Sequence, residues 1–220
     1  MKDIEPAKPA VAPDLTGRVS DFWTRNVNAE RIMGRTVSEH GRGSEEYFRD
    51  LEMQRYRSHR HLAAWIGSMQ PGSRVLEVGC GIGLDSAQMV RHGLKVTAMD
   101  LTAVGASTAS ARAQEQGWDA EYVCANGENL PFPDQTFDYV YSFGVMHHAA
   151  DTQRCIDEAH RVLRDGGQAL IMLYHRHSLN EAVHRLVRVP FEERDELCPV
   201  VRRFTRSEVR TMFARYRSVS

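Results

Sequence analysis

Three glycines at alternate positions, Gly79, Gly81 and Gly83, follow a short β-branched run and precede a helical pattern. Glycines between a strand and a helix allow a tight turn and let a small molecule lie against the backbone. Asp100 lies at the end of the next predicted strand, where a carboxylate can accept both hydroxyl protons of a ribose. The combination predicts a site for a nucleoside-containing cofactor.

The spacing and charge of this loop separate two classes of cofactor. Dinucleotide sites favour G-x-G-x-x-G, which leaves the helix N-terminus free to hold a pyrophosphate. Here the spacing is G-x-G-x-G, and Glu77 lies two residues before the first glycine. Its carboxylate would repel a pyrophosphate, but it suits a cofactor that carries an ammonium group and no phosphate. The loop therefore favours S-adenosylmethionine, with a nicotinamide dinucleotide as the rival.

The elements around the loop alternate between strands and helices. Strands are expected at residues 74–78, 94–99, 121–125, 136–142 and 168–173. Helices are expected at residues 45–66, 84–92, 102–116, 207–216 and from Asp151 onward. This alternation predicts an α/β fold, in which a doubly wound, mostly parallel sheet carries helices on both faces. Ligands of such sheets bind at the carboxyl ends of the strands, where the candidate residues fall.

Composition narrows the class of protein. The chain has 220 residues, 42% apolar and 26% charged, with a net charge of −1, which is ordinary for a globular protein and unlike a basic nucleic-acid binder. No apolar run reaches the roughly 20 residues of a membrane span, and the N-terminus lacks the apolar core of a signal peptide. The four cysteines are scattered without a C-x-x-C pair. We therefore expect free thiols and a cytoplasmic location, without a membrane partner.

Four stretches resemble a known family. VLEVGCGIGLDS resembles the first motif of the class I S-adenosylmethionine-dependent methyltransferases. VTAMDLT, ANGENLPFPDQTFDYVYSFGVMHH and EAHRVLRDGGQALIML resemble later motifs of the subgroup that includes quinone-biosynthesis and natural-product enzymes. The resemblance covers residues 72–175. It implies a Rossmann-like fold, S-adenosyl-L-methionine as cofactor, and methyl transfer to a small molecule through an oxygen, nitrogen or carbon nucleophile.

The resemblance also assigns cofactor-binding positions. The methionine part of the cofactor would lie against Glu77 and the glycine loop, that is, Gly79, Cys80, Gly81 and Gly83. The nucleoside would lie against Asp100, Leu101, Asn126, Gly127 and Glu128, and the sulfonium near Ser142, Phe143 and Gly144. The family usually has aspartate where this chain has Asn126. An amide can still accept from the adenine amino group and donate to a ring nitrogen, so binding is expected to survive.

The sequence after the fourth strand excludes several acceptor classes. Enzymes that methylate nucleic-acid amino groups resemble one another in an Asn/Asp-Pro-Pro-aromatic run, where this chain has Ser142-Phe143-Gly144-Val145. The Pro-Cys nucleophile of cytosine-C5 enzymes and the two-glutamate loop of protein-arginine enzymes are also missing from the sequence. A small-molecule acceptor remains, with no nucleic-acid partner.

Four residues are candidates for a catalytic base. His147 and His148 follow the fourth strand, and Tyr174 and His175 follow the fifth. Histidine titrates near neutral pH, which suits a general base, although the same residues could pack beneath the cofactor or cap a helix. No carboxylate joins the histidines at ligand spacing, so no metal is expected.

The rest of the chain divides into three expected parts. Residues 1–20 are predicted to be a disordered tail, residues 21–70 an N-terminal helical lid, and residues 71–220 the methyltransferase core. Lid candidates are Trp23, Tyr47, Tyr56 and Arg57.

A helical insertion near residues 178–200 would be a substrate cap or a contact in a homodimer. The family's sheet ends in an antiparallel hairpin that residues 217–220 could only begin. The hairpin is expected to be incomplete or completed by a partner. A non-catalytic cofactor-binding or scaffold protein is the second rival function.

Overall fold

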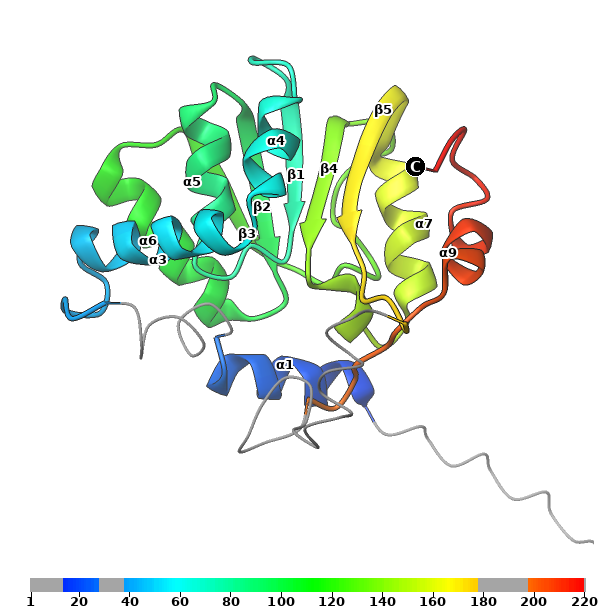
Figure 1. Cartoon of the computed structure of the whole chain (residues 1–220), viewed down its shortest axis with the longest axis horizontal. Coiled ribbons are helices and arrows are strands. Elements are labelled where there is room, and N and C mark those ends of the chain that lie inside the picture. Colours follow the sequence, from blue (N-terminus) through cyan, green and yellow to red (C-terminus); the bar gives the residue numbers. More distant parts are fainter. Residues whose placement is uncertain (1–13, 28–37, 178–197, 220) are drawn as a thin grey trace, which may run out of the picture.

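A computed structural model describes residues 14–27, 38–177 and 198–219. Its centre is a five-stranded sheet in the order β3-β2-β1-β4-β5, in which all neighbouring strands are parallel. The strands are β1 (Arg74–Val78), β2 (Lys95–Asp100), β3 (Ala120–Cys124), β4 (Phe137–Phe143) and β5 (Leu163–Met172). The order reverses between β1 and β4, which confirms the predicted doubly wound α/β fold (Figure 1).

Each face of the sheet has its own hydrophobic core, because successive side chains of a strand point to opposite sides. Val75 packs into a cluster with Leu62, Met89 and Ala109 from the helices α4 (His61–Gly67), α5 (Leu84–Arg91) and α6 (Ala103–Gln116). Leu76, the next residue of β1, packs into a second cluster with Ile156 from α7 (Thr152–Val162). Both faces are therefore covered, as expected for a parallel sheet.

Helix caps fix where the loops at the strand ends begin and finish. Thr102 caps α6 by accepting from Gly105 N, and Asp151 caps α7 by accepting from Arg154 N. A side-chain oxygen at this position satisfies one of the free N–H groups of the first turn. These helices start within one residue of the predicted positions, because capping residues can be recognised in the sequence.

The predicted helix at residues 45–66 is two helices, α3 (Glu45–Ser58) and α4. His59 breaks it with φ −125° and ψ 64°. The break has a packing reason: α3 buries Leu51 against the glycine loop residue Ile82, whereas α4 buries Leu62 against the sheet. One straight helix could not pack against both the glycine loop and the sheet.

The elements at the C-terminal side also differ from the prediction. Strand β5 begins at Leu163, five residues before the predicted start at residue 168. Gly166 has φ 78°, and the register with β4 shifts between Phe137 and Tyr139, so the added residues include an irregularity within the strand. The last helix, α9 (Arg206–Met212), is shorter than predicted.

The N-terminal helix α1 (Leu15–Arg25) begins inside the segment that was expected to be a disordered tail, so that boundary is wrong. Asp14 caps α1 by accepting from Gly17 N at 2.8 Å, and Val19 and Phe22, three residues apart, are buried. In Figure 1, α1 crosses the carboxyl ends of the strands. Residues 1–13 of the expected tail and residues 178–197 of the expected insertion lie outside the described residues.

Within the described ranges, β3 and β5 are the two edges of the sheet, and no antiparallel hairpin follows β5. In the described part of the chain beyond β5, an isolated parallel bridge pairs His175 with Phe204. None of the described helices combines the length and apolar character that crossing a bilayer requires.

Candidate active site

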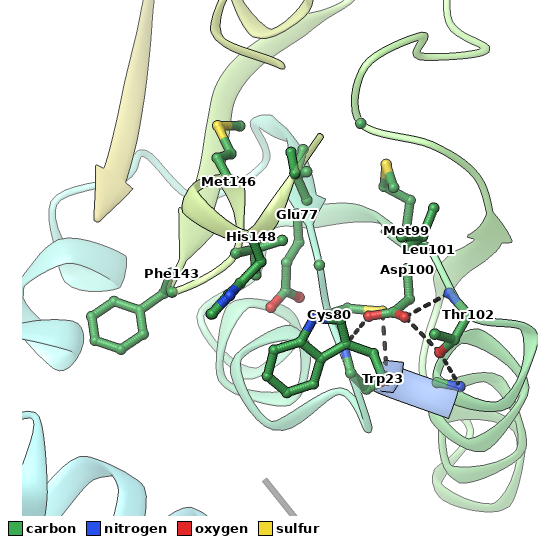
Figure 2. Close-up of a pocket in the computed structure, with 18 of the residues that line it drawn as sticks. Trp23, Glu77, Cys80, Met99, Asp100, Leu101, Thr102, Phe143, Met146 and His148 are labelled. Atoms are coloured by element: carbon green, nitrogen blue, oxygen red, sulfur yellow. Dashed lines mark hydrogen bonds between the residues drawn. The ribbon is translucent and has the colours of Figure 1, made fainter. Parts of the chain in front are cut away.

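A cavity of about 460 Å³ lies at the carboxyl ends of the strands, with residues of α1 among its walls. It brings together 13 of the residues predicted from the sequence. They are Glu77, Gly79, Cys80, Gly81, Asp100, Leu101, Asn126, Gly127, Glu128, Phe143, Gly144, His148 and Tyr174. Figure 2 shows residues from distant parts of the chain around this space, among them Trp23 of α1, Glu77 of β1 and Asp100 of β2.

The glycine loop is held against β2 by its own backbone. Gly79 N and Cys80 N both donate to Met99 O, at 2.8 and 2.9 Å. A Cβ on Gly79, where φ is 82°, would lie 2.3 Å from a methyl carbon of Val145, so only glycine fits there. A Cβ on Gly81 would meet nothing within 4 Å. The loop thus presents a bare, fixed backbone to the cavity, as a ligand lying close to it requires.

Asp100 is oriented by three hydrogen bonds. One carboxylate oxygen accepts from Gly81 N at 2.9 Å, and the other accepts from Thr102 N at 2.9 Å and Thr102 Oγ1 at 2.7 Å (Figure 2). A carboxylate has about four acceptor positions, so capacity for about one ribose hydroxyl remains while the others fix the group. The structure therefore leaves less free capacity here than the two hydroxyls expected from the sequence.

Glu77 is 3% exposed and turns its carboxylate toward the cavity (Figure 2). Ser86 Oγ donates a short hydrogen bond to it. Burial, and then the charge of Asp85, raise the pKa of Glu77 to about 8. A cation bound beside Glu77 would restore its charged form. The residue fits an ammonium group and would oppose a phosphate.

A buried ion pair lines the cavity and was not predicted from the sequence. Arg55 of α3 donates to both oxygens of Asp85 in α5, and the Nε–Oδ1 distance is 2.7 Å. Tyr56 and Tyr141 donate to the same carboxylate at 2.9 and 2.8 Å. Burial alone would raise the pKa of Asp85, but the guanidinium and the two hydroxyls hold it below its usual value. The cluster joins α3, α5 and β4 into one support for the glycine loop.

This cluster left only a weak signal in the sequence. Arg55 falls in the polar middle of the predicted helix, where an arginine usually faces solvent. Asp85 sits in the first turn of α5, where an acidic residue is common for helix-dipole reasons alone. Asp85 is only 2% exposed, so it also belongs to the buried interior.

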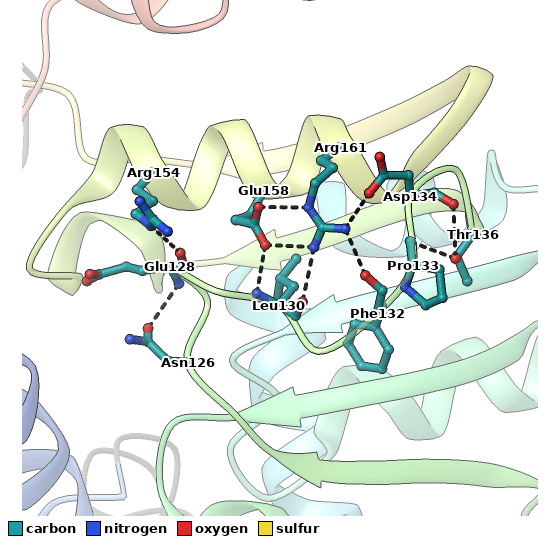
Figure 3. A network of polar contacts seen from close by, with 10 residues as sticks. All are labelled: Asn126, Glu128, Leu130, Phe132, Pro133, Asp134, Thr136, Arg154, Glu158 and Arg161. Atoms are coloured by element: carbon teal, nitrogen blue, oxygen red, sulfur yellow. Dashed lines mark hydrogen bonds and ion pairs between the residues drawn. The ribbon is translucent and has the colours of Figure 1, made fainter.

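The loop after β3 is fixed by one arginine of α7. Arg161 donates to the backbone oxygens of Leu130 and Phe132 at 3.0 and 2.8 Å, and it pairs with Asp134 and Glu158 (Figure 3). A planar guanidinium with five donors can bind several acceptors at once. The loop that carries Asn126 is therefore anchored to a rigid helix.

His148 lies on the opposite wall, 4% exposed, with Trp23 edge-on at 5.0 Å between ring centroids. Its Nδ1 lies 2.7 Å from Val200 O, and because a carbonyl only accepts, Nδ1 carries the proton. Nε2 is then the basic nitrogen. Burial lowers the pKa of His148 to about 4, so the ring is neutral at physiological pH.

The other three catalytic candidates are arranged differently. His147 is 0% exposed and does not line the cavity, and its ring packs 3.7 Å from that of Tyr174, which does. Burial lowers the pKa of His147 to about 2. His175 is exposed, lies outside the cavity lining, and its Nδ1 accepts from His177 N. In the described ranges, no three His, Cys, Asp or Glu side chains form a metal-binding group.

Two predicted cofactor residues support the site without lining it. Ser142 Oγ donates to Val78 O at 3.0 Å and so ties β4 to β1. Gly83 brings α5 close to α6, because a Cβ there would lie 3.1 Å from that of Ala109. Among the lid candidates, Trp23 lines the cavity, whereas Tyr47, Tyr56 and Arg57 do not.

Comparisons with known proteins agree with this geometry. A family model described as "Methyltransferase domain" matches residues 76–171. The ubiquinone biosynthesis O-methyltransferase of Parvibaculum lavamentivorans is 35% identical over 103 residues, which are 47% of this chain and 41% of that protein. Sterol 24-C-methyltransferase ERG6B of Gibberella zeae is 32% identical over 112 residues, 50% of this chain and 30% of that protein.

The chain thus matches less than half the length of these two relatives. The crystal structure of a geranyl diphosphate C-methyltransferase from Streptomyces coelicolor, in complex with S-adenosyl-L-homocysteine, has a TM-score of 0.64. It is 17% identical, and the alignment covers 95% of this chain and 81% of that one, so it supports the fold. The family match, with the parallel sheet and its glycine loop, identifies residues 76–171 as a methyltransferase domain of the class I S-adenosyl-L-methionine-dependent type.

Proposed function

We propose that this chain transfers a methyl group from S-adenosyl-L-methionine to a small-molecule acceptor by in-line displacement. One observation carries the proposal: a single cavity joins an acidic region around Glu77 and Asp100 to an aromatic region around Phe143, His148 and Tyr174. The acidic region suits a cationic, ribose-bearing cofactor. The aromatic region offers a separate place for an acceptor.

In this proposal the residues of β1 and β2 bind and orient. Glu77 pairs with the ammonium group, the backbone of Gly79–Gly81 follows the methionine chain, and Asp100 accepts from the ribose. When bound, the cofactor supplies an electrophilic methyl group on a sulfonium. The ring of Phe143 lines the same space, with the Arg55 guanidinium 5.0 Å from its centroid. Holding donor and acceptor in line can supply most of the acceleration.

His148 is proposed as the base for an acceptor that arrives protonated. The neutral ring with its proton on Nδ1 carries its basic lone pair on Nε2, which is the atom proposed to take a proton from a hydroxyl. Tyr174 lines the cavity beside it and is proposed to orient the acceptor. The names of the two relatives imply methylation of oxygen in one and of carbon in the other, so the acceptor atom is a matter for experiment.

The first experiment is calorimetric titration of the purified chain with S-adenosyl-L-homocysteine, with NADH in parallel. We expect micromolar binding of the former alone. Binding of NADH alone would contradict the proposal in favour of a dehydrogenase. A screen of hydroxylated, amino and enolic small molecules with methyl-labelled cofactor follows. Cofactor binding without transfer to any acceptor would favour the cofactor-binding scaffold instead.

A further inference from the structure

Asn126 lies next to the ribose-binding position. Asp100 pairs with Cys124 at the ends of β2 and β3, and Ala125 N donates to Asp100 O at 2.9 Å. Asn126, the next residue, lines the same cavity. A nucleoside whose ribose is held by Asp100 would therefore extend its base toward Asn126.

The amide of Asn126 has a defined orientation. Its Oδ1 accepts from Glu128 N at 2.9 Å, and a backbone N–H can only donate. The opposite orientation would set the amide NH2 against that N–H, so the oxygen must face Glu128. Figure 3 shows Oδ1 turned toward Glu128 and Nδ2 pointing away from it. Among the described residues, none accepts a hydrogen bond from Nδ2.

The partner that sets this orientation is itself held by α7. Arg154 Nε donates to Glu128 O at 2.7 Å, and Asp151 N donates to Glu128 Oε1 at 3.0 Å. These contacts turn the carboxylate of Glu128 toward the start of α7 and fix its backbone (Figure 3). Asn126 cannot reorient without breaking a hydrogen bond within an anchored loop.

We propose that Asn126 reads the base of the cofactor as a hydrogen-bond donor, through Nδ2, and that it does not select for the 6-amino group of adenine. The inference rests on the proposed cofactor and concerns its specificity. The sequence predicted that the amide could both accept from the adenine amino group and donate to a ring nitrogen. The bond to Glu128 occupies one of the two acceptor positions of Oδ1 and turns Nδ2 away from it, which favours donation. A donor at this position can pair with N1 of adenine or with the oxygen of a 6-oxo purine. A carboxylate there would accept from the 6-amino group and repel a 6-oxo oxygen.

The test compares two ligands and three proteins. The ligands are S-adenosyl-L-homocysteine and S-inosyl-L-homocysteine, in which a 6-oxo group replaces the 6-amino group. The proteins are the wild-type chain, Asn126→Asp and Asn129→Asp. Asn129 belongs to the same loop, is exposed and does not line the cavity, so its substitution adds the same charge as a matched control. Calorimetry gives the ratio of the two dissociation constants for each protein.

We expect the wild-type chain and Asn129→Asp to bind the two ligands within about tenfold of each other. Asn126→Asp should raise the ratio by about tenfold or more in favour of the 6-amino ligand, because one acceptor replaces one donor. A wild-type preference of more than a hundredfold for the 6-amino ligand would overturn the proposal, even if Asn126→Asp failed to fold. So would an unchanged ratio in Asn126→Asp. Failure of the proposed function would look different: the wild-type chain would bind neither ligand.

Discussion

The two regions of the cavity are built in different ways. The region at the tips of β1, β2 and β3 is polar and locally encoded: the carboxylate of Asp100 is bound by Thr102, and Asn126 by Glu128, each two residues away. The region at the tips of β4 and β5 is aromatic and assembled from distant segments. His148 there meets Trp23 of α1 and the backbone of Val200, both more than 50 residues away in the chain.

Under the proposed function, this difference separates cofactor binding from acceptor specificity. Short-range turns orient Asp100 and Asn126, while arginines from α3 and α7 anchor the loops that carry the site. The aromatic region depends on α1, α7 and the segment around Val200 packing together, so it can change its acceptor by changes in those segments. Fold-level likeness therefore indicates the cofactor far better than the acceptor.

The largest expected effect comes from the ion pair that supports both regions. Asp85→Ala leaves Arg55 buried without its partner, which should lower the free energy of unfolding by about 3–5 kcal/mol. Urea unfolding measures this loss. The double variant Arg55→Met/Asp85→Leu should recover part of it: no buried charge remains, although the hydroxyls of Tyr56 and Tyr141 still lack their acceptor. Equal loss in the single and double variants would show that the ion pair is not the cause.

Asp100→Ala tests the polar region alone. It removes a charged acceptor for the ribose and the contact that holds Gly81, so affinity for S-adenosyl-L-homocysteine should fall about a hundredfold or more. Calorimetry measures the affinity, with Asp119→Ala, an exposed aspartate before β3, as control. Wild-type affinity in Asp100→Ala would mean that the ribose is bound elsewhere.

His148→Gln tests the aromatic region alone. For an acceptor that must lose a proton, kcat should fall about a hundredfold while affinity for S-adenosyl-L-homocysteine stays within about twofold. A base works when deprotonated, so wild-type activity should fall only as the pH drops toward the lowered pKa of about 4, and not near 6.5. His175→Gln should behave as wild type, because His175 does not line the cavity. A parallel loss of cofactor affinity in His148→Gln would show that the two regions are not separate.

The smallest effect concerns the pH dependence of cofactor binding. Because the pKa of Glu77 is raised to about 8, its charged form grows as the pH rises toward that value. Affinity for S-adenosyl-L-homocysteine should therefore increase about tenfold between pH 6.5 and 8, and Glu77→Gln should lose this increase. A pH-independent affinity in the wild-type chain would mean that Glu77 does not pair with the ammonium group.

Several features could be predicted from the sequence because they depend on neighbours in the chain. The parallel alternation of strands and helices, the capped starts of α6 and α7, and the glycine loop followed by Asp100 all have local physical causes. The four motifs also identified the family and its cofactor. The break at His59 and the helical start at Leu15 were missed, since both are decided by what each helix packs against.

The tertiary structure alone decided how the site is completed. It paired Arg55 with Asp85, separated His148 from His147 by turning only one ring into the cavity, and left His175 at the surface. It also fixed the orientation of the Asn126 amide, through the hydrogen bond from the backbone of Glu128. Residue type and spacing determine what chemistry a position can offer. Which group is buried, and which way it faces, depends on the packing of segments far apart in the chain.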